Sequence, residues 1–402
     1  MKKYNRLKYA CYMNNVSMSV TANLSPLLFL TFRELYGISY SELGFLILVN
    51  FITQLGVDLA LSFFSHKFDI EKTVKRIPIL TAIGFVIFAI LPLVLSRFAY
   101  IGILIGTIIF SASSGLTEVL VSPVIAAIPS KNTERELSVL HSVYAWGVVV
   151  IVPLATLFLW GFRAENWWIL PLIFTVIPIV GIMLVSGADI PNIETPKMTS
   201  SALDLMKNSG LWLSVIGIFL GGATECTMSQ WASGYIERAL GIPKIFGDVL
   251  GVAAFALMLG IGRSLYAKYA KHTEKLLVCG AVGATLCYLV AAVVDFAPIG
   301  LAACALTGFF ASILWPGSLI VAADRFSAGG VFVYAIMAAG GDFGASVAPQ
   351  LVGLVADGVI GSASFSDIAV TLGVGAEQLG MKLGMLTGMM FPLAATPRRP
   401  HD

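Results

Sequence analysis

Charged residues are scarce in this sequence. Asp, Glu, Lys and Arg make up only 12% of the 402 residues, whereas soluble domains carry about 25%. Apolar residues make up 57%, and the mean hydropathy is +0.88. This composition predicts a polytopic membrane protein whose partner is the lipid bilayer. The net charge of +2 offers no strongly basic surface, so we expect no nucleic-acid partner.

Cysteine and histidine are also few, and their spacing favours no metal or catalytic site. The five cysteines are odd in number and all lie in apolar runs, and the four histidines are scattered. The metalloprotease motif HExxH and the hydrolase motif GxSxG are both missing. We therefore expect no disulfide framework, no metal, no cofactor and no enzymatic activity. A sensor that does not transport would need an added soluble domain, and the sequence shows none.

Long apolar runs fill most of the chain. At about 20 residues for each crossing, they predict an all-α membrane protein with twelve transmembrane helices. The basic N-terminal stretch is not interpreted as a signal peptide, because the apolar run after it is too long and ends in no small-residue cleavage site. The predicted spans are residues 8–33, 41–65, 76–96, 98–128, 138–161, 167–186, 209–236, 246–268, 275–295, 298–322, 329–357 and 380–396.

The placement of basic residues predicts the orientation. With the N-terminus inside, 19 of the 25 lysines and arginines fall on the cytoplasmic side, which favours cytoplasmic termini in an inner or plasma membrane. The longest polar gap divides the spans six and six. We expect an N-terminal six-helix bundle over residues 1–186, a cytoplasmic linker over 187–207 and a C-terminal six-helix bundle over 208–402. Two pseudo-symmetric bundles are typical of large secondary transporters.

The fourth span carries a carboxylate, Glu118. An ionised group at membrane depth costs about 2.5–3.5 kcal/mol on insertion scales, so such residues usually face a polar interior or a water-filled path. Ser122 lies one helical turn after Glu118 and shares its face. Pro123 leaves a backbone carbonyl free, which only protein or cavity water can satisfy. We interpret Glu118 as a functional group, with a structural ion pair as the alternative.

Further polar and aromatic residues lie inside other spans. Asn15, Ser19 and Asn23 follow one face of the first span, where they either hold helices together or line a polar cavity. In the seventh span, Gly221-Gly222 indicates a bent helix before Glu225. Four more residues are candidates for a binding surface or a second ionisable site, with core packing as the alternative for the tryptophans: Gln230, Trp231, Trp315 and Asp342.

Several stretches in chain order resemble the major facilitator superfamily, and within it the fucose permease-like sugar:proton symporters. The loop after the second span is a degenerate form of the superfamily's G-x-x-x-D-R-x-G-R-R motif, with Ser62, His66, Lys67 and Asp69 in the Gly, Asp, Arg and Gly places. Stretches similar to the symporter branch are Glu118-x-x-x-Ser122-Pro123, Leu137 to His141 with Gly147 and Pro153, Glu225 to Trp231 with Tyr235, Gly262-Arg263, Trp315-Pro316, and Gly340-Gly341 with Gly344 and Pro349.

The resemblance implies the major facilitator fold and a secondary active transporter that works by alternating access. The expected partner is a small polar solute, with a sugar favoured, and proton symport is favoured over uniport. We expect a monomer. The implied substrate-binding residues are Asn15, Ser19, Asn23, Gln54, Glu118, Ser122, Tyr144, Glu225, Gln230, Trp231 and Trp315. The expected proton-coupling residues are Glu118, Glu225 and Asp342, and the expected gate residues are Asp58, His66, Lys67, Arg263, Asp324 and Arg325.

Two alternatives remain open. Fucose permease carries an acid just before a proline in its first span, whereas this sequence has Asn23-Leu24-Ser25-Pro26 there, which allows a sugar uniporter. The second alternative is efflux of drug-like or cationic compounds, with Glu225 and Asp342 as cation sites. Against efflux, Val148 and Val152 occupy the places of the glycines in the antiporter pattern G-x-x-x-G-P.

The predicted topology can be tested at the linker. A cysteine that replaces Lys197 should react with a membrane-impermeant thiol reagent only after the cytoplasmic side is made accessible, because the basic residues place this loop inside. Labelling of Lys197→Cys from the outside of intact cells would contradict both the orientation and the six-plus-six division.

Overall fold

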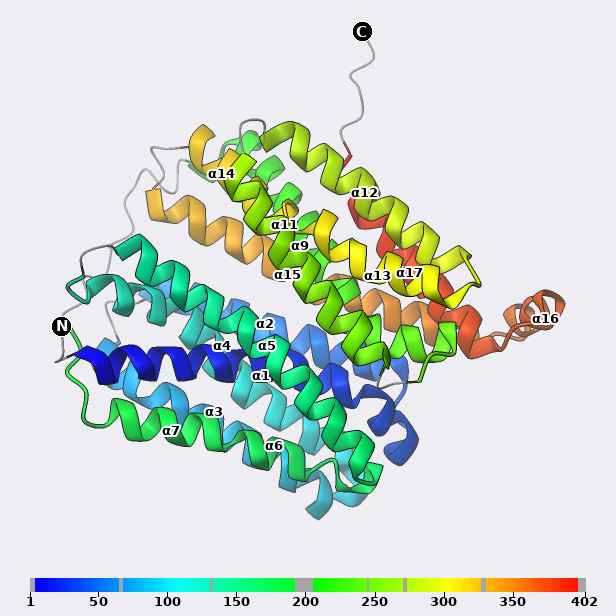
Figure 1. Cartoon of the computed structure of the whole chain (residues 1–402), viewed down its shortest axis with the longest axis horizontal. Helices are drawn as coiled ribbons and strands as arrows, with labels where there is room; N and C mark the ends of the chain where they lie inside the picture. Colours follow the sequence, from blue (N-terminus) through cyan, green and yellow to red (C-terminus); the bar gives the residue numbers. More distant parts are fainter. Residues whose placement is uncertain are drawn as a thin grey trace, which may run out of the picture. The chain divides into compact units, whose positions relative to one another are not determined.

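The computed structural model describes residues 4–64, 68–130, 133–191, 205–243, 246–269, 273–326 and 330–396, and throughout these residues the chain is helical without a strand (Figure 1). The helices are α1 (Asn5–Tyr36), α2 (Tyr40–Phe64), α3 (Ile70–Val94), α4 (Ala99–Ala127), α5 (Thr133–Gly161), α6 (Ile169–Phe174), α7 (Val176–Val185), α9 (Ser209–Leu240), the π-helix η5 (Gly247–Ala253), α11 (Ala254–Tyr269), α12 (Thr273–Val293), α13 (Ala297–Ala311), α14 (Leu314–Arg325), α15 (Gly330–Ile360), α16 (Ala363–Leu372) and α17 (Ala376–Ala394).

Helices lie at each of the twelve predicted ranges. Within the described residues, nine helical stretches are long and apolar enough to cross a membrane. α1 is not among these nine, and its buried polar side chains, such as Asn14 and Thr21, explain its lower hydropathy. The short helix α16 was not predicted, and the last helix begins at Ala376 rather than at residue 380.

Three predicted spans each consist of two helical elements, namely α6 with α7, η5 with α11, and α13 with α14, and in two of them the break comes just before a proline. Proline has no backbone N–H, so the carbonyl four residues before it loses its helical partner. Pro178 follows the break at Thr175 between α6 and α7, and Pro316 follows the break at Ser312 between α13 and α14. Prolines also lie inside α1, α3, α4, α5, α15 and α17 without dividing them, so a proline alone does not determine where a helix breaks.

The chain forms two compact units. The first comprises Met1–Tyr36 and Val49–Met198, and the second comprises Gly37–Leu48 and Thr199–Asp402. The start of α2 is thus grouped with the second unit. Most of the predicted linker lies outside the described residues, and the division at residues 187–207 stays a prediction.

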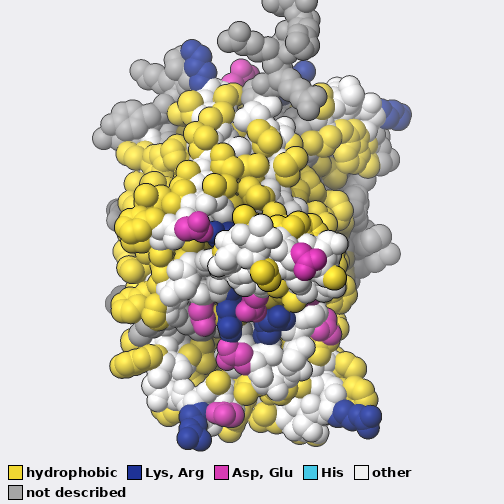
Figure 2. All heavy atoms as spheres, turned by 90° about the vertical axis from the view of Figure 1, so that its right-hand side faces the viewer, with side chains coloured by type: hydrophobic (Ala, Val, Ile, Leu, Met, Phe, Trp, Pro, Cys, Tyr) yellow, Lys and Arg dark blue, Asp and Glu magenta, His cyan; other side chains and the backbone are white. Residues whose placement is uncertain are grey.

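Large apolar side chains lie exposed on many helices. Among the most exposed are Val94, Trp146, Trp160 and Val370, and hydrophobic side chains cover much of the face in Figure 2. On the same face, acidic and basic side chains lie next to one another near the middle. Exposed apolar surface on this scale is unfavourable in water and suits contact with lipid.

Close backbone contact joins α3 to α4 in the first unit. A Cβ atom added to Gly106 would lie 2.5 Å from Phe88 Cα, and one added to Gly84 would lie 2.7 Å from Phe110 N. The rings of Phe88 and Phe110 pack 5.5 Å apart between the two helices. Helices in lipid gain no hydrophobic energy from association, so small residues that allow close van der Waals contact hold them together.

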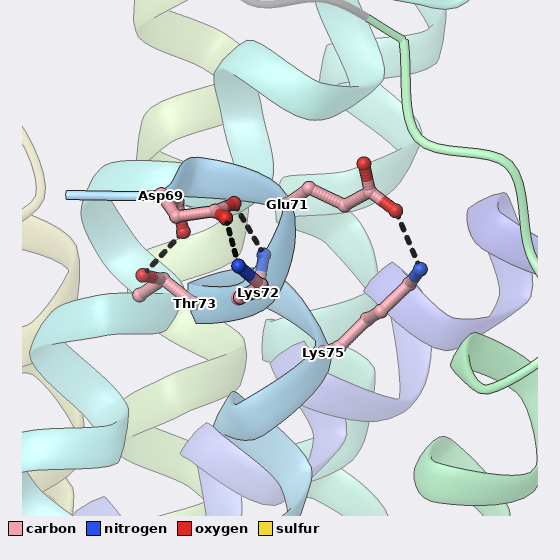
Figure 3. Close-up of polar contacts among 5 residues, drawn as sticks. All are labelled: Asp69, Glu71, Lys72, Thr73 and Lys75. Carbon is pink, nitrogen blue, oxygen red and sulfur yellow. Dashed lines mark hydrogen bonds and ion pairs between the residues drawn. The ribbon is translucent and has the colours of Figure 1, made fainter.

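The start of α3 is fixed by Asp69, which explains why this helix begins before residue 76. The Asp69 carboxylate accepts hydrogen bonds from the Lys72 amide at 3.0 Å and forms an ion pair with Lys72 Nζ at 2.9 Å (Figure 3). Lys75 donates to Glu71 one turn further on. These contacts with Lys72 hold the pKa of Asp69 below its usual value.

We expect Gly106→Ala to destabilise the protein, because the new methyl group would collide with the Phe88 backbone. Overpacking of this kind costs about 1–3 kcal/mol. Gly56→Ala is the matched control: nothing lies within 4 Å of a Cβ at Gly56, and alanine favours a helix over glycine. Thermal unfolding in detergent should show a lower Tm for Gly106→Ala alone. Equal Tm values for the two variants would contradict the packing.

The Asp69 cap should have a pH-dependent effect on stability. A carboxylate with a lowered pKa stabilises the fold above its unfolded pKa of about 3.9 and loses this contribution as the pH falls through its folded pKa. Asp69→Ala should therefore lower Tm at pH 7, whereas Asp69→Asn should lower it less because asparagine also caps helices. The deficit of Asp69→Ala should shrink toward pH 3. A deficit that is constant with pH would show that the charge is not involved.

Candidate functional site

Two carboxylates meet inside the first unit. Glu118 on α4 and Asp58 on α2 have carboxylate oxygens within 4.8 Å of one another. Glu118 is exposed, Asp58 is partly buried, and Ser122 lies partly buried one turn after Glu118. Asp58 was predicted as a gate residue, but the structure brings it to the candidate proton-coupling acid. The sequence signal that could have found it is its position one turn after Gln54, inside the second span.

A row of polar groups continues from this pair between the same two helices. Gln54 is buried, and its Nε2 donates to Asn50 Oδ1 at 3.2 Å; Ser111 Oγ donates to the same oxygen at 2.5 Å. A Cβ added to Gly115 would lie 3.0 Å from the Gln54 carbonyl oxygen. This glycine therefore lets α4 approach α2 closely enough for the polar groups to meet.

The polar face of the first span holds helices together. Asn15 Nδ2 donates to the Leu140 carbonyl at 2.9 Å, and Ser19 Oγ donates to the Tyr144 carbonyl at 2.7 Å. Both bonds join α1 to α5. Asn23 Nδ2 donates to the Ser19 carbonyl at 2.9 Å within α1. In this conformation these donors are used in helix packing, which favours the first of the two interpretations made from the sequence, and their role in substrate binding stays a prediction.

The second unit contains an ion pair inside the spans. Arg263 Nη2 on α11 lies 3.0 Å from both carboxylate oxygens of Glu225 on α9. Glu225 was predicted to bind substrate or protons and Arg263 to act in a gate, and the structure joins the two residues. Nothing in the sequence spacing indicates this pairing, because the two residues are 38 positions apart on different helices.

Trp231 lies in tight packing within the second unit. Its side chain is 1% exposed, its indole N–H donates to the Pro349 carbonyl at 2.9 Å, and its ring packs 5.9 Å from that of Tyr40. Its neighbour Gln230 is also buried. These contacts suit the packing interpretation in this conformation, and a role in binding for either residue stays a prediction.

The paired glycines of the seventh span allow α9 to lie close to α15. α9 runs as one helix through Gly221-Gly222, and the predicted bend at these glycines stays a prediction. A Cβ added to Gly222 would lie 2.3 Å from the Gly341 carbonyl oxygen of α15. Trp315 packs beside this contact: its Cη2 would lie 2.3 Å from a Cβ added to Gly341. The buried Asp342 follows directly.

The structure gives little information on the other four predicted gate residues. His66 and Lys67 lie outside the described residues. Asp324 and Arg325 are exposed at the end of α14, and the Arg325 guanidinium lies 5.9 Å from the centre of the Phe326 ring. Their function as gate residues stays a prediction.

Sequence reasoning missed an acidic residue that caps α2. Asp357 of α15 accepts hydrogen bonds from the Tyr40 amide at 3.1 Å and the Ser41 amide at 2.5 Å, both in the second unit. The Tyr40 hydroxyl donates to Glu377 at 2.7 Å. A helix N-terminus with a carboxylate on its first N–H groups is electrostatically favourable. The partners are more than 300 residues apart, so no local pattern could have indicated this cap.

Comparison with solved structures places this helical arrangement among transporters of known fold. The D-xylose-proton symporter matches with a TM-score of 0.75 at 14% identity, over 100% of this chain and 99% of that chain. A bacterial homologue of the human lysosomal transporter Spinster matches with a TM-score of 0.71 at 12% identity, over 98% and 96%. The E. coli fucose:proton symporter matches with a TM-score of 0.58 at 15% identity, over 98% and 100%.

A search of curated protein sequences finds no match. The profile of the Major Facilitator Superfamily, in contrast, matches residues 10–349, which is most of the chain. The described helices agree with the fold of that family over the full length. The chain therefore belongs to the Major Facilitator Superfamily, as a multi-pass membrane transporter and not an enzyme.

Proposed function

We propose that this transporter moves a small polar solute, with a sugar favoured, by alternating access, and that Glu118 and Asp58 couple the movement to protons. The main support is that their carboxylate oxygens, on two neighbouring spans, lie at most 4.8 Å apart. At an effective dielectric constant of about 20, two negative charges this close repel by at least about 3.5 kcal/mol. A single proton held by the pair removes this repulsion.

The pair thereby links proton occupancy to access. Excluding water from two charged carboxylates has a high desolvation free energy. Excluding it from a pair that holds one proton costs much less. The pair would take up a proton on the outer side, move in the protonated state and release the proton when water returns from the inner side. The row formed by Asn50, Gln54 and Ser111, with Ser122 one turn after Glu118, supplies donors and acceptors for solute hydroxyl groups beside the pair.

The sugar:proton symporters among the solved structures share the fold, and their low identity carries no information on the substrate. Support for a sugar comes from the stretches in this sequence that resemble the symporter branch. Uniport remains the alternative, because the first span lacks the acid of that branch. Cation efflux is weakened by the pairing of Glu225 with Arg263, since a neutral ion pair is a poor cation site.

The remaining assignments also belong to this proposal. We place the transporter in an inner or plasma membrane with both termini in the cytoplasm, because of the basic loops. We expect it to work as a monomer.

Glu118→Gln should keep solute exchange and lose accumulation. Glutamine resembles the protonated acid, so counterflow at equal pH in proteoliposomes should survive while uptake driven by a pH gradient should not. The solutes are labelled pentoses and hexoses selected by thermal shift, since a bound ligand stabilises the protein. Glu71→Gln is the matched control, because this acid pairs with Lys75 outside the proposed site. Accumulation of solute by Glu118→Gln would exclude Glu118 as the coupling acid. If the pH gradient does not change solute uptake by the unmodified protein, the protein is a uniporter.

A further inference from the structure

Arg263 uses only part of its hydrogen-bonding capacity. A guanidinium group has five N–H donors on three nitrogen atoms in a planar fork. Nη2 alone contacts the two oxygens of Glu225, and within the described residues Nη1 and Nε have no hydrogen-bond partner. The Arg263 side chain is 47% exposed, whereas that of Glu225 is 17% exposed. The unused edge of the guanidinium therefore lies on the accessible side of the ion pair.

The position of Arg263 within an apolar segment limits what can surround this edge. Arg263 lies in the segment Val249–Tyr266, and Glu225 lies in Ser209–Leu240; both segments are long and apolar enough to span a membrane. A charged side chain in such a segment faces water or protein and avoids lipid, because the cost in hydrocarbon is high. Protein does not cover the exposed part of Arg263, so an aqueous path is the surrounding that this cost favours.

We propose that Arg263 binds the carboxylate of a sugar acid and that Glu225 takes up a proton when this anion binds. This inference rests on the proposed transport function and narrows its substrate class. The empty site holds Arg263 positive and Glu225 negative. After the anion and one proton have entered, Arg263 pairs with the substrate carboxylate and Glu225 carries the proton on one of its oxygens. The site is neutral in both states, which is what movement through the membrane interior requires.

Charge decides which solute can displace Glu225. Hydrogen bonds between a guanidinium and a carboxylate are charge-assisted and about twice as strong as bonds between neutral groups. The hydroxyl groups of a neutral sugar cannot replace the Glu225 carboxylate on Arg263, whereas a second carboxylate can. Arginine also presents two parallel N–H groups, so its geometry suits a carboxylate better than lysine does.

Further titratable groups lie near Glu225. Cys226 lies next to it on α9, within electrostatic reach of Tyr288 on α12 and of the buried Asp342 on α15. A substrate anion would bring further negative charge into a region that already contains Glu225 and Asp342. Uptake of one proton by Glu225 removes this excess, because Arg263 then balances the substrate alone.

The test compares sugars that differ only in charge. D-glucuronate and D-galacturonate have the rings of D-glucose and D-galactose, with a carboxylate in place of the terminal hydroxymethyl group. In proteoliposomes we expect uptake of a labelled uronate under an inside-alkaline gradient, with at least tenfold preference over its neutral partner. The proton on Glu225 cancels the charge of the anion, so in Glu118→Gln, whose first pair carries no transported proton, a membrane potential set with potassium and valinomycin should leave uronate uptake unchanged. In the unmodified protein the proton of the Glu118–Asp58 pair moves as well, so an inside-negative potential should increase the uptake.

Three variants assign the roles. Arg263→Lys should weaken uronate binding at least tenfold while keeping the positive charge that Glu225 needs. Glu225→Gln should bind the uronate several-fold more tightly, because the competing carboxylate is gone, and the pH dependence of that binding should disappear. Lys275→Gln, an exposed cation at the start of α12, is the matched control and should behave like the unmodified protein. Binding is measured by thermal shift, which also shows that each variant is folded.

Each contrary outcome has a definite meaning. Gradient-driven uptake of neutral sugars without uptake of uronates would overturn this inference and leave the proposed function standing. Uronate uptake by Glu118→Gln that responds to the membrane potential, or uronate binding that Arg263→Lys leaves unchanged, would contradict the exchange of Glu225 for the substrate carboxylate on Arg263. Absence of binding and uptake for acids and neutral sugars alike would reject both proposals.

Discussion

The high cost of an unpaired charge in hydrocarbon is the constraint on which this structure depends. Each ionised group in a span costs about 2.5–3.5 kcal/mol on insertion scales, so it needs a partner or an aqueous path. The first unit places Glu118 near Asp58, and the second joins Glu225 to Arg263. Both arrangements lie on helices whose remaining residues are mostly apolar. The charges are therefore gathered in places where they can be neutralised.

Close helix packing is the second requirement, and glycine meets it in both units. Gly106 lets α4 lie against the backbone of α3, and Gly344 does the same for α15 against α9, where an added Cβ would lie 2.0 Å from the Phe219 carbonyl oxygen. Lipid supplies no hydrophobic force between helices, so van der Waals contact and hydrogen bonds must hold them. Gly115 shows the functional consequence, because its small size allows Gln54 and the row beside Glu118 to approach α4.

Hydropathy predicted most of the fold, because the bilayer sets the length of a spanning helix. The breaks before Pro178 and Pro316 were not predicted, because prolines elsewhere in the chain lie inside unbroken helices. Glu118 stood out as a carboxylate within an apolar run. Its partner Asp58 and the pairing of Glu225 with Arg263 did not, because each depends on how separate helices are rotated and packed. The cap of α2 by Asp357 is an extreme case: it joins residues more than 300 positions apart.

In the two proposals the pairs respond to different ligands, because two carboxylates carry a net negative charge whereas a carboxylate and a guanidinium are neutral together. Two carboxylates repel until a proton arrives, so the pair of Glu118 and Asp58 responds to a proton without any substrate charge. Glu225 and Arg263 are already neutral together, so a proton alone would leave Arg263 uncompensated, and an anion alone would leave excess negative charge. Only a proton and an anion together preserve neutrality there. A neutral sugar therefore needs the first pair alone, whereas an acidic sugar gives the second pair a function that packing does not explain.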